Sequence, residues 1–119
     1  MKLADAIRKG SQQRPQAFGD FFEKVEGQIL GSCAIGAAIE GYFGDTTARI
    51  EELHTAFPIL DKVVEGPEQG MRAELCNVIT DLNDMCDWTR ECIADWVETI
   101  EENLDGQTMA TPKEDPKTL

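Results

Sequence analysis

The spacing of apolar residues in the last third of the chain constrains the fold more than any other feature of the sequence. Between positions 71 and 85 this spacing is carried by Leu75, Val78, Ile79 and Leu82. Intervals of three and four residues place side chains on one face of an α-helix. The same spacing continues after position 89 in Ile93, Trp96, Val97, Ile100 and Leu104. We therefore predict two helices, over 71–86 and 89–103.

The link between these two helices predicts a hairpin. Asp87 and Trp88 form a short connection, and Thr89 is a residue type that caps helix N-termini with its side-chain oxygen. Trp88 before the cap and Ile93 four residues after it fit a hydrophobic staple. Such a staple would fix the angle between the two helices.

Three further helices are indicated by apolar spacing and by the residues that border them. Pro15 ends the first, because the residue before a proline avoids the helical conformation. Gly44 suits the position after the second, and Asp45 can cap the third. The predicted elements are helices over 2–13, 32–43 and 46–56, a helical turn or an extended piece over 59–64, and a loop over 66–70.

These elements predict an all-α fold, a small bundle of four to five short helices closed by the C-terminal helical hairpin. Residues 1–105 would form a single helical domain, and the proline-broken polar residues 106–119 a flexible tail. The small residues of 32–43 would let a neighbouring helix approach closely, and Phe18, Phe21 and Phe22 would pack inward. The predicted core is Leu3, Ile7, Phe21, Ile35, Ile39, Leu75, Ile79, Leu82, Trp88, Ile93, Trp96, Val97 and Ile100.

The composition narrows the classes of function. A net charge of −12 on 119 residues opposes direct binding of nucleic acid, which needs Lys and Arg to displace counterions from phosphates. No run of about 18 apolar residues exists, so no membrane span is expected. The first residues lack the apolar stretch of a signal peptide. We therefore expect a cytoplasmic protein whose cysteines, Cys33, Cys76, Cys86 and Cys92, are free thiols.

The charge is unevenly distributed along the chain. Residues 1–24 carry a net charge of +2 and residues 65–105 a net charge of −10, so the N-terminal segment either packs on the acidic half or faces elsewhere. The last predicted helix bears an acidic stripe opposite its apolar face, formed by Glu91, Asp95, Glu98 and Glu102. The stripe would repel phosphate, which argues against DNA recognition despite the helix-turn-helix outline of the hairpin.

Catalytic and cofactor motifs are missing. The glycines at 31, 36 and 41 do not form a phosphate-binding loop, since Ala37 and Ala38 stand where Lys and Ser or Thr are needed. His54, the single histidine, is available as a base for Cys33, but nothing near either residue supports such a pair. We expect no enzymatic activity and no cofactor.

Several stretches resemble a family of small bacterial and phage proteins without an assigned activity. The most specific is the closing signature, in which Leu82-Asn83-Asp84 is followed by Trp88-Thr89-Arg90-Glu91 and Ile93-Ala94-Asp95-Trp96-Val97-Glu98. Residues 2–8, 14–19, 33–38 and 57–60 are similar to the same family. The resemblance covers most of residues 1–102. It implies common ancestry, and a phage or mobile-element origin, without supplying a function.

Some members of this family carry a Cys-x-x-Cys pair and two histidines that suggest a zinc site. Here no such pair precedes Cys76, and Asp81 and Cys86 stand at the histidine positions. A structural zinc normally needs four Cys or His ligands, so the resemblance implies that no metal is retained. A degenerate zinc-site domain, with Cys76, Cys86, Cys92 and Asp81 near the metal, is the alternative hypothesis.

The acidic stripe carries the leading hypothesis. Its simpler interpretation is a solvated face that keeps the protein soluble. The functional interpretation is a non-catalytic protein-interaction module that binds a basic partner protein through Glu91, Asp95, Glu98 and Glu102. At a rise of about 1.5 Å per residue the four carboxylates span roughly 16 Å. Such a row suggests a nucleic-acid mimic acting on a host nuclease or defence complex.

Overall fold

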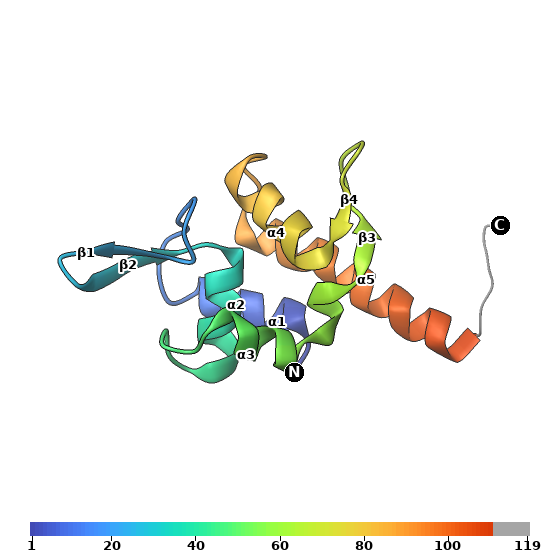
Figure 1. The fold of residues 1–119 in the computed structure, drawn as a ribbon, viewed down its shortest axis with the longest axis horizontal. Helices are drawn as coiled ribbons and strands as arrows, with labels where there is room; N and C mark the ends of the chain where they lie inside the picture. Colours follow the sequence, from blue (N-terminus) through green and yellow to red (C-terminus); the bar gives the residue numbers. More distant parts are fainter. Residues whose placement is uncertain (111–119) are drawn as a thin grey trace.

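The computed structural model describes the backbone of residues 1–110 and the side chains of residues 1–104 (Figure 1). The predicted tail, residues 106–119, lies from position 111 onward outside the described residues. The elements, in chain order, are α1 (Leu3–Ser11), β1 (Phe22–Val25), β2 (Gln28–Ser32), α2 (Ala34–Phe43), α3 (Ile50–Ala56), the 3-10 helix η1 (Pro58–Asp61), β3 (Val63–Glu65), β4 (Arg72–Glu74), α4 (Leu75–Asp84) and α5 (Arg90–Ala110).

The prediction of an all-α fold is wrong, because two antiparallel hairpins accompany the five α-helices. β1 pairs with β2 across a two-residue turn, in which Glu26 and Gly27 have φ values of 52° and 80°. β3 pairs with β4 across the predicted loop 66–70. Both hairpins expose most of their side chains. They therefore lack a buried face, and a strand without one need not alternate apolar and polar residues in its sequence.

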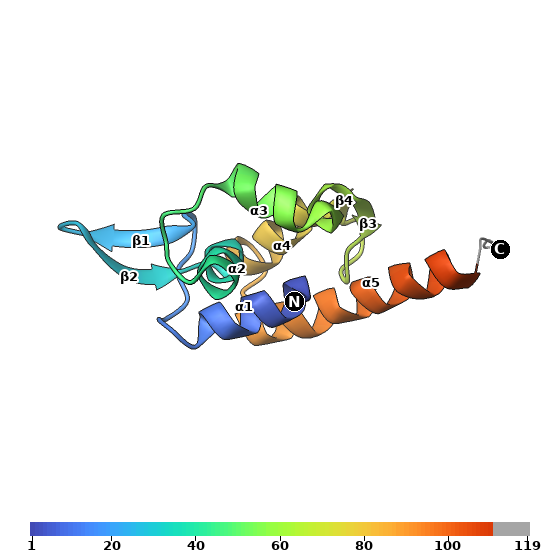
Figure 2. The ribbon, with the colours of Figure 1, turned by 90° about the horizontal axis from the view of Figure 1, so that it is seen from below.

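Glycines set the close packing of α1 against α2. A Cβ atom on Gly10 would overlap the backbone of Ala37, and one on Gly41 would overlap the carbonyl of Ala6. The prediction that small residues allow close helix approach is thus confirmed. α1 lies between α2 and α5, as Figure 2 shows.

Helix starts differ from the predictions where tertiary structure decides them. α3 begins at Ile50 rather than 46, because Asp45 accepts from the N–H of Thr47 in a separate turn. That hydrogen bond lowers the pKa of Asp45. α4 begins at Leu75, since the preceding residues form β4. The Thr89 cap is confirmed, with Thr89 Oγ1 accepting from the N–H of Cys92 at 3.1 Å.

The core forms where α1, α2, α4 and α5 meet. Nine predicted core residues are buried: Leu3, Ile7, Ile35, Ile39, Leu75, Ile79, Leu82, Ile93 and Val97. Trp88 and Trp96 are half-buried against this core, and Ile100 is half-buried. Phe21 was wrongly placed in the core, and so was Phe18, because both precede a hairpin that projects from the helices.

Candidate functional site

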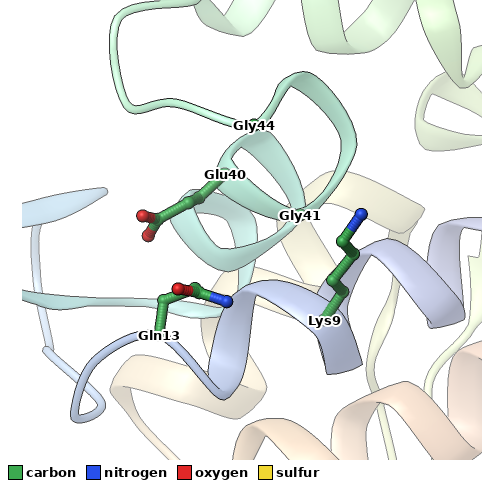
Figure 3. A pocket seen from close by; sticks show the side chains of 5 residues that line it. All are labelled: Lys9, Gln13, Glu40, Gly41 and Gly44. Carbon is green, nitrogen blue, oxygen red and sulfur yellow. The ribbon is translucent and has the colours of Figure 1, made fainter.

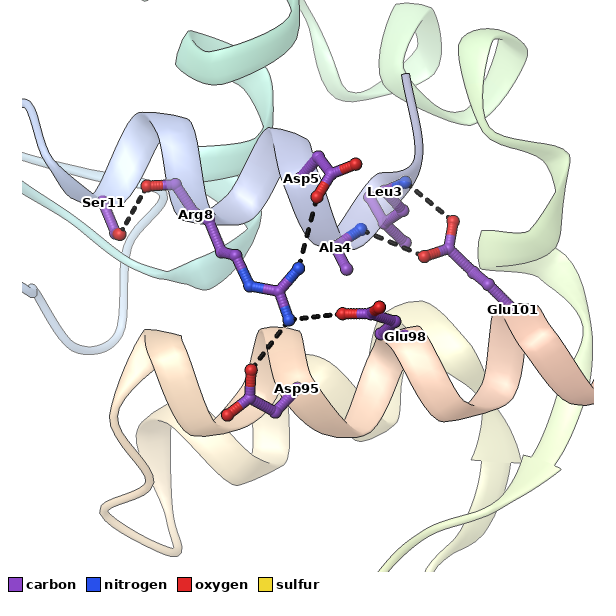
Figure 4. A network of polar contacts seen from close by, with 8 residues as sticks. All are labelled: Leu3, Ala4, Asp5, Arg8, Ser11, Asp95, Glu98 and Glu101. Atoms are coloured by element: carbon purple, nitrogen blue, oxygen red, sulfur yellow. Dashed lines mark hydrogen bonds and ion pairs between the residues drawn. The ribbon is translucent and has the colours of Figure 1, made fainter.

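One cation of α1 is shared by several carboxylates at the seam with α5. Arg8 Nη2 donates to Asp95 Oδ1 at 2.7 Å and to Glu98 Oε1 at 2.6 Å, and Arg8 Nη1 donates to Asp5 Oδ1 at 3.2 Å (Figure 4). The hydrogen bonds to Asp95 and then to Glu98 raise the pKa of Arg8. Three carboxylates thus converge on one guanidinium and leave an excess of negative charge.

Contacts at both ends of α1 extend this seam. Near the C-terminal end of α1, Ser11 Oγ lies 3.2 Å from Glu91 Oε2. At the N-terminal end, the N–H groups of Leu3 and Ala4 donate to the two carboxylate oxygens of Glu101 at 2.7 and 3.2 Å. The two helices are therefore antiparallel, and the acidic face of α5 follows α1 over its length. We call Glu91, Asp95, Glu98, Glu101 and Glu102 the carboxylate row.

Glu101 is the member of the row that sequence reasoning missed. The cap position of α1 is held by Lys2, whose side chain makes no capping bond. Glu101 supplies the missing acceptor from another helix. Its negative charge at the N-terminus of α1 also interacts favourably with the dipole of that helix. Glu102, which the sequence did single out, is exposed and makes no polar contact with the residues whose side chains the structure describes.

Asn83, in the closing signature, is the centre of a buried hydrogen-bond network. Asn83 is fully buried. Its Oδ1 accepts from Gln16 Nε2 at 2.8 Å and from the N–H of Ala34 at 3.1 Å, and its Nδ2 donates to the carbonyl of Ala17 at 3.0 Å. One amide therefore holds the end of α4, the start of α2 and the loop that precedes β1.

The Arg of the same signature has a comparable position. Arg90 is 5% exposed and donates to the carbonyls of Ser11, Arg14 and Ser32 at 3.2, 2.8 and 3.2 Å. Burial lowers its pKa, and its Nε lacks a hydrogen-bond partner among the described residues. The residues behind the family resemblance thus join the α4–α5 turn to the loop over 12–17.

The structure does not join the possible nucleophile and base. Cys33 is buried at the N-cap of α2, where its Sγ accepts from the N–H of Gly36 at 3.4 Å. Burial raises the pKa of this thiol, which opposes the thiolate form that attacks substrates. His54 Nδ1 instead lies 2.8 Å from Asp61 Oδ1.

The possible metal ligands are also separate. Among the residues whose side chains are described, no group of three or more His, Cys, Asp or Glu is arranged to hold a metal ion. Cys76 and Cys86 are half-buried and Cys92 is exposed. Burial raises the pKa of Cys76 to about 11, so this thiol stays protonated at neutral pH.

A polar hollow of about 200 Å³ lies between α1 and α2 (Figure 3). Lys9 of α1 and Gln13, two residues beyond its end, line one side, and Glu40 and Gly41 of α2 line the other with Gly44, the C-cap of that helix. Arg14 binds both oxygens of Glu40, at 2.8 and 2.7 Å, which raises the pKa of Arg14. The small volume of the hollow leaves room for an ion or a few water molecules.

Comparisons with models of protein families, with curated proteins and with solved structures found no match. The resemblance of the closing signature therefore stays a prediction. Within the part of the chain that the structure describes, no helix is both long and apolar enough to cross a membrane.

Proposed function

We propose that the protein is a non-catalytic interaction module that binds a basic surface of a partner protein through the carboxylate row. The alternative metal-binding function is favoured by no observation. We further propose that it acts in the cytoplasm, where its four free cysteines would stay reduced.

The observation that carries this proposal is the shortage of cations along the row. Arg8 is the one cationic side chain that forms ion pairs with it among the described residues, while Asp5 competes for the same guanidinium. Asp95 stays 73% exposed. Its contact with Arg8 holds it in place without covering it, which lowers the entropy lost when a partner binds.

The partner that fits this chemistry presents several Lys or Arg side chains along a groove. Proteins that bind nucleic acid carry such grooves, because their cations neutralise phosphates. The row would then act as a nucleic-acid mimic, with fast and salt-dependent association. A phage origin would fit a host nuclease or defence complex as the target.

The test compares two charge-matched variants in an affinity capture from nuclease-treated host lysate. E91Q/E102Q neutralises two row members that do not contact Arg8 and leaves Glu101, the cap of α1, unchanged, and E51Q/E74Q neutralises two exposed acids elsewhere. A partner specific to the row is expected to bind the parent and the E51Q/E74Q variant. The purified partner should bind E91Q/E102Q at least about tenfold more weakly than it binds the parent protein.

Salt separates this outcome from apolar binding. Capture through the row should be lost when the sodium chloride concentration rises, because exposed charges are screened beyond a short distance. Equal affinity of the partner for E91Q/E102Q and for the parent would remove the row from the proposed function.

A further inference from the structure

The β1–β2 hairpin projects from the helices and exposes apolar side chains. Together with the preceding residues it forms what we call the arm, residues 18–32, which extends away from the helical part in Figures 1 and 2. Four large apolar side chains of the arm are between 41% and 56% exposed, namely Phe18, Phe21, Val25 and Leu30. Such a concentration on a projecting element is typical of a contact surface.

The base of the arm is firmly held. The N–H of Cys33 donates to the carbonyl of Phe21 at 3.0 Å, and a Cβ atom on Gly36 would overlap that same carbonyl. Arg90 Nη1 also contacts Ser32, at 2.9 Å from its Oγ. The arm therefore presents its strands in a fixed direction.

The two outer edges of the hairpin differ. Along β2, the N–H of Ala17 donates to the carbonyl of Ser32 at 2.8 Å, and the N–H of Ser32 donates to Pro15 at 3.0 Å. Arg14 Nη1 covers the carbonyl of Ile29 at 2.8 Å. By contrast, Phe22–Val25 of β1 makes no backbone hydrogen bond to any described residue outside β2.

The register identifies the backbone groups that β1 leaves free. Val25 and Gln28 flank the two-residue turn, and residues in that position form a hydrogen-bonded pair. The register shifts between Glu23 and Lys24, but the extra residue, Leu30, is on β2, so backbone groups still alternate along β1 and those of Phe22 and Lys24 point away from β2. The inward carbonyl of Phe21, which accepts from Cys33, agrees with this alternation. An open edge with free N–H and C=O groups can accept another strand.

Side chains beside this edge indicate what strand would fit. Asp20, Phe21, Phe22 and Lys24 line a shallow hollow of about 430 Å³. Lys24 is the single cation of the arm, against Asp20, Glu23 and Glu26. A complementary strand would place a bulky apolar side chain in the hollow and Lys or Arg beside the acids.

A second copy of the chain fits this edge poorly. Two β1 strands paired about a twofold axis through the middle of the strand would place Glu23 or Lys24 opposite its own equivalent. Like charges directly opposite in a sheet are destabilising. The net charge of −12 on each chain adds to this repulsion.

We propose that β1 binds an extended peptide segment of a partner protein as a third, antiparallel or parallel, strand. The segment carries a bulky apolar residue with Lys or Arg at alternate positions. This binding goes beyond the carboxylate row and does not depend on it, because the arm and the row lie on different elements.

The test uses a synthetic peptide in which lysine alternates with valine around one central phenylalanine. Amide NMR spectra of the isotope-labelled full chain are recorded as the peptide is added up to about 1 mM. We expect saturable shifts at the amides of Phe22 and Lys24, together with slower hydrogen exchange there. The E91Q/E102Q variant should bind the peptide equally, which separates this proposal from the function of the row.

Two controls distinguish strand pairing from simple charge attraction. K24P removes an outward N–H at an edge position, where proline is tolerated, and K24Q removes only the charge. Affinity should fall about tenfold or more with K24P and be retained with K24Q. A peptide N-methylated at every residue has the same charge but cannot donate from either edge, and this control holds even if K24P disturbs the arm. Equal binding of that peptide, or no saturable shift at Phe22 and Lys24, would overturn the proposal.

Discussion

At the scale of single residues, Asn83 shows why the closing signature has its composition. A buried polar group must be hydrogen-bonded, or it costs about 1–3 kcal/mol. Asn83 meets this requirement by joining the loop before β1 to α2 and α4. Because an amide both donates and accepts, neither Asp nor Leu at this position could replace all three contacts.

The cysteines should differ in reactivity according to their burial. With iodoacetamide at about pH 8, we expect Cys92 to be alkylated first, because it is exposed. Cys33 and Cys76 should react last, since burial raises the pKa of each thiol and covers it. Peptide mass mapping over time measures the order. Equal rates for Cys33 and Cys92 in folded protein would contradict the burial of Cys33.

The raised pKa of Cys76 also predicts how the stability of the folded protein depends on pH. The pKa of Cys76 rises from 9.0 to about 11 on folding, so the folded state favours the protonated thiol. This contribution is fully present below pH 9 and is lost as the pH rises toward about 11. Urea unfolding of C76S over this range is the control, and its stability should fall less steeply with pH than that of the parent.

At the scale of elements, Glu101 should stabilise α1 from outside the helix. E101Q removes the charge that accepts from Leu3 and Ala4, and we expect the free energy of unfolding to fall by about 1 kcal/mol. Urea unfolding followed by circular dichroism measures the change.

The neighbouring Glu102 provides the matched control for this change. E102Q has the same chemistry on the same helix but no described polar contact, and it should change stability by less than about 0.5 kcal/mol. Equal losses in E101Q and E102Q would mean that general charge on α5, rather than the cap, determines the effect.

The predictability of the elements follows the burial of their faces. α1, α4 and α5 each bury an apolar face, so apolar spacing in the sequence indicates them, whereas α2 is buried on most sides and is indicated by its small residues and by Gly44. β1 is mostly exposed, so nothing constrains its side chains to alternate. Its best local signal is Glu26-Gly27, a weaker turn pair than Asn-Gly. The hairpin was therefore missed.

The sequence indicates the acidic face of α5 but does not indicate that α1 packs beside it. Sequence reasoning left open whether the basic N-terminal segment packs on the acidic half, and the contacts of Arg8 show that it does. Apolar spacing alone does not state which helices pack together, since that depends on the tertiary arrangement. For the same reason Glu101 could not be distinguished from Glu102 before the position of α1 was known.

At the scale of the whole molecule, its charge predicts a response to salt. Raising sodium chloride from about 0.01 M to about 0.1 M shortens the Debye length from about 30 Å to about 10 Å. The repulsion within a chain of net charge −12 should then weaken. Close pairs such as Arg8–Glu98, at 2.6 Å, are screened less. We therefore expect the free energy of unfolding to increase with salt.

Potassium chloride is the control for this measurement. Screening depends on ionic strength and not on the cation, so both salts should stabilise equally. A difference between them would indicate specific ion binding, and a decrease in stability with either salt would show that ion pairs outweigh the repulsion.

The polar contacts between α1 and α5 also have a consequence for the order in which the helices can pack during protein synthesis. α1 leaves the ribosome before α5, but Glu101, which caps its N-terminus, and Glu98, which pairs with Arg8, belong to α5. Until α5 emerges, α1 has its close partner α2, but Arg8 lacks Asp95 and Glu98 and has only Asp5 of its own helix among its described ion-pair partners. The polar contacts of α1 with Asp95, Glu98 and Glu101 can therefore form only after α5 has been synthesised.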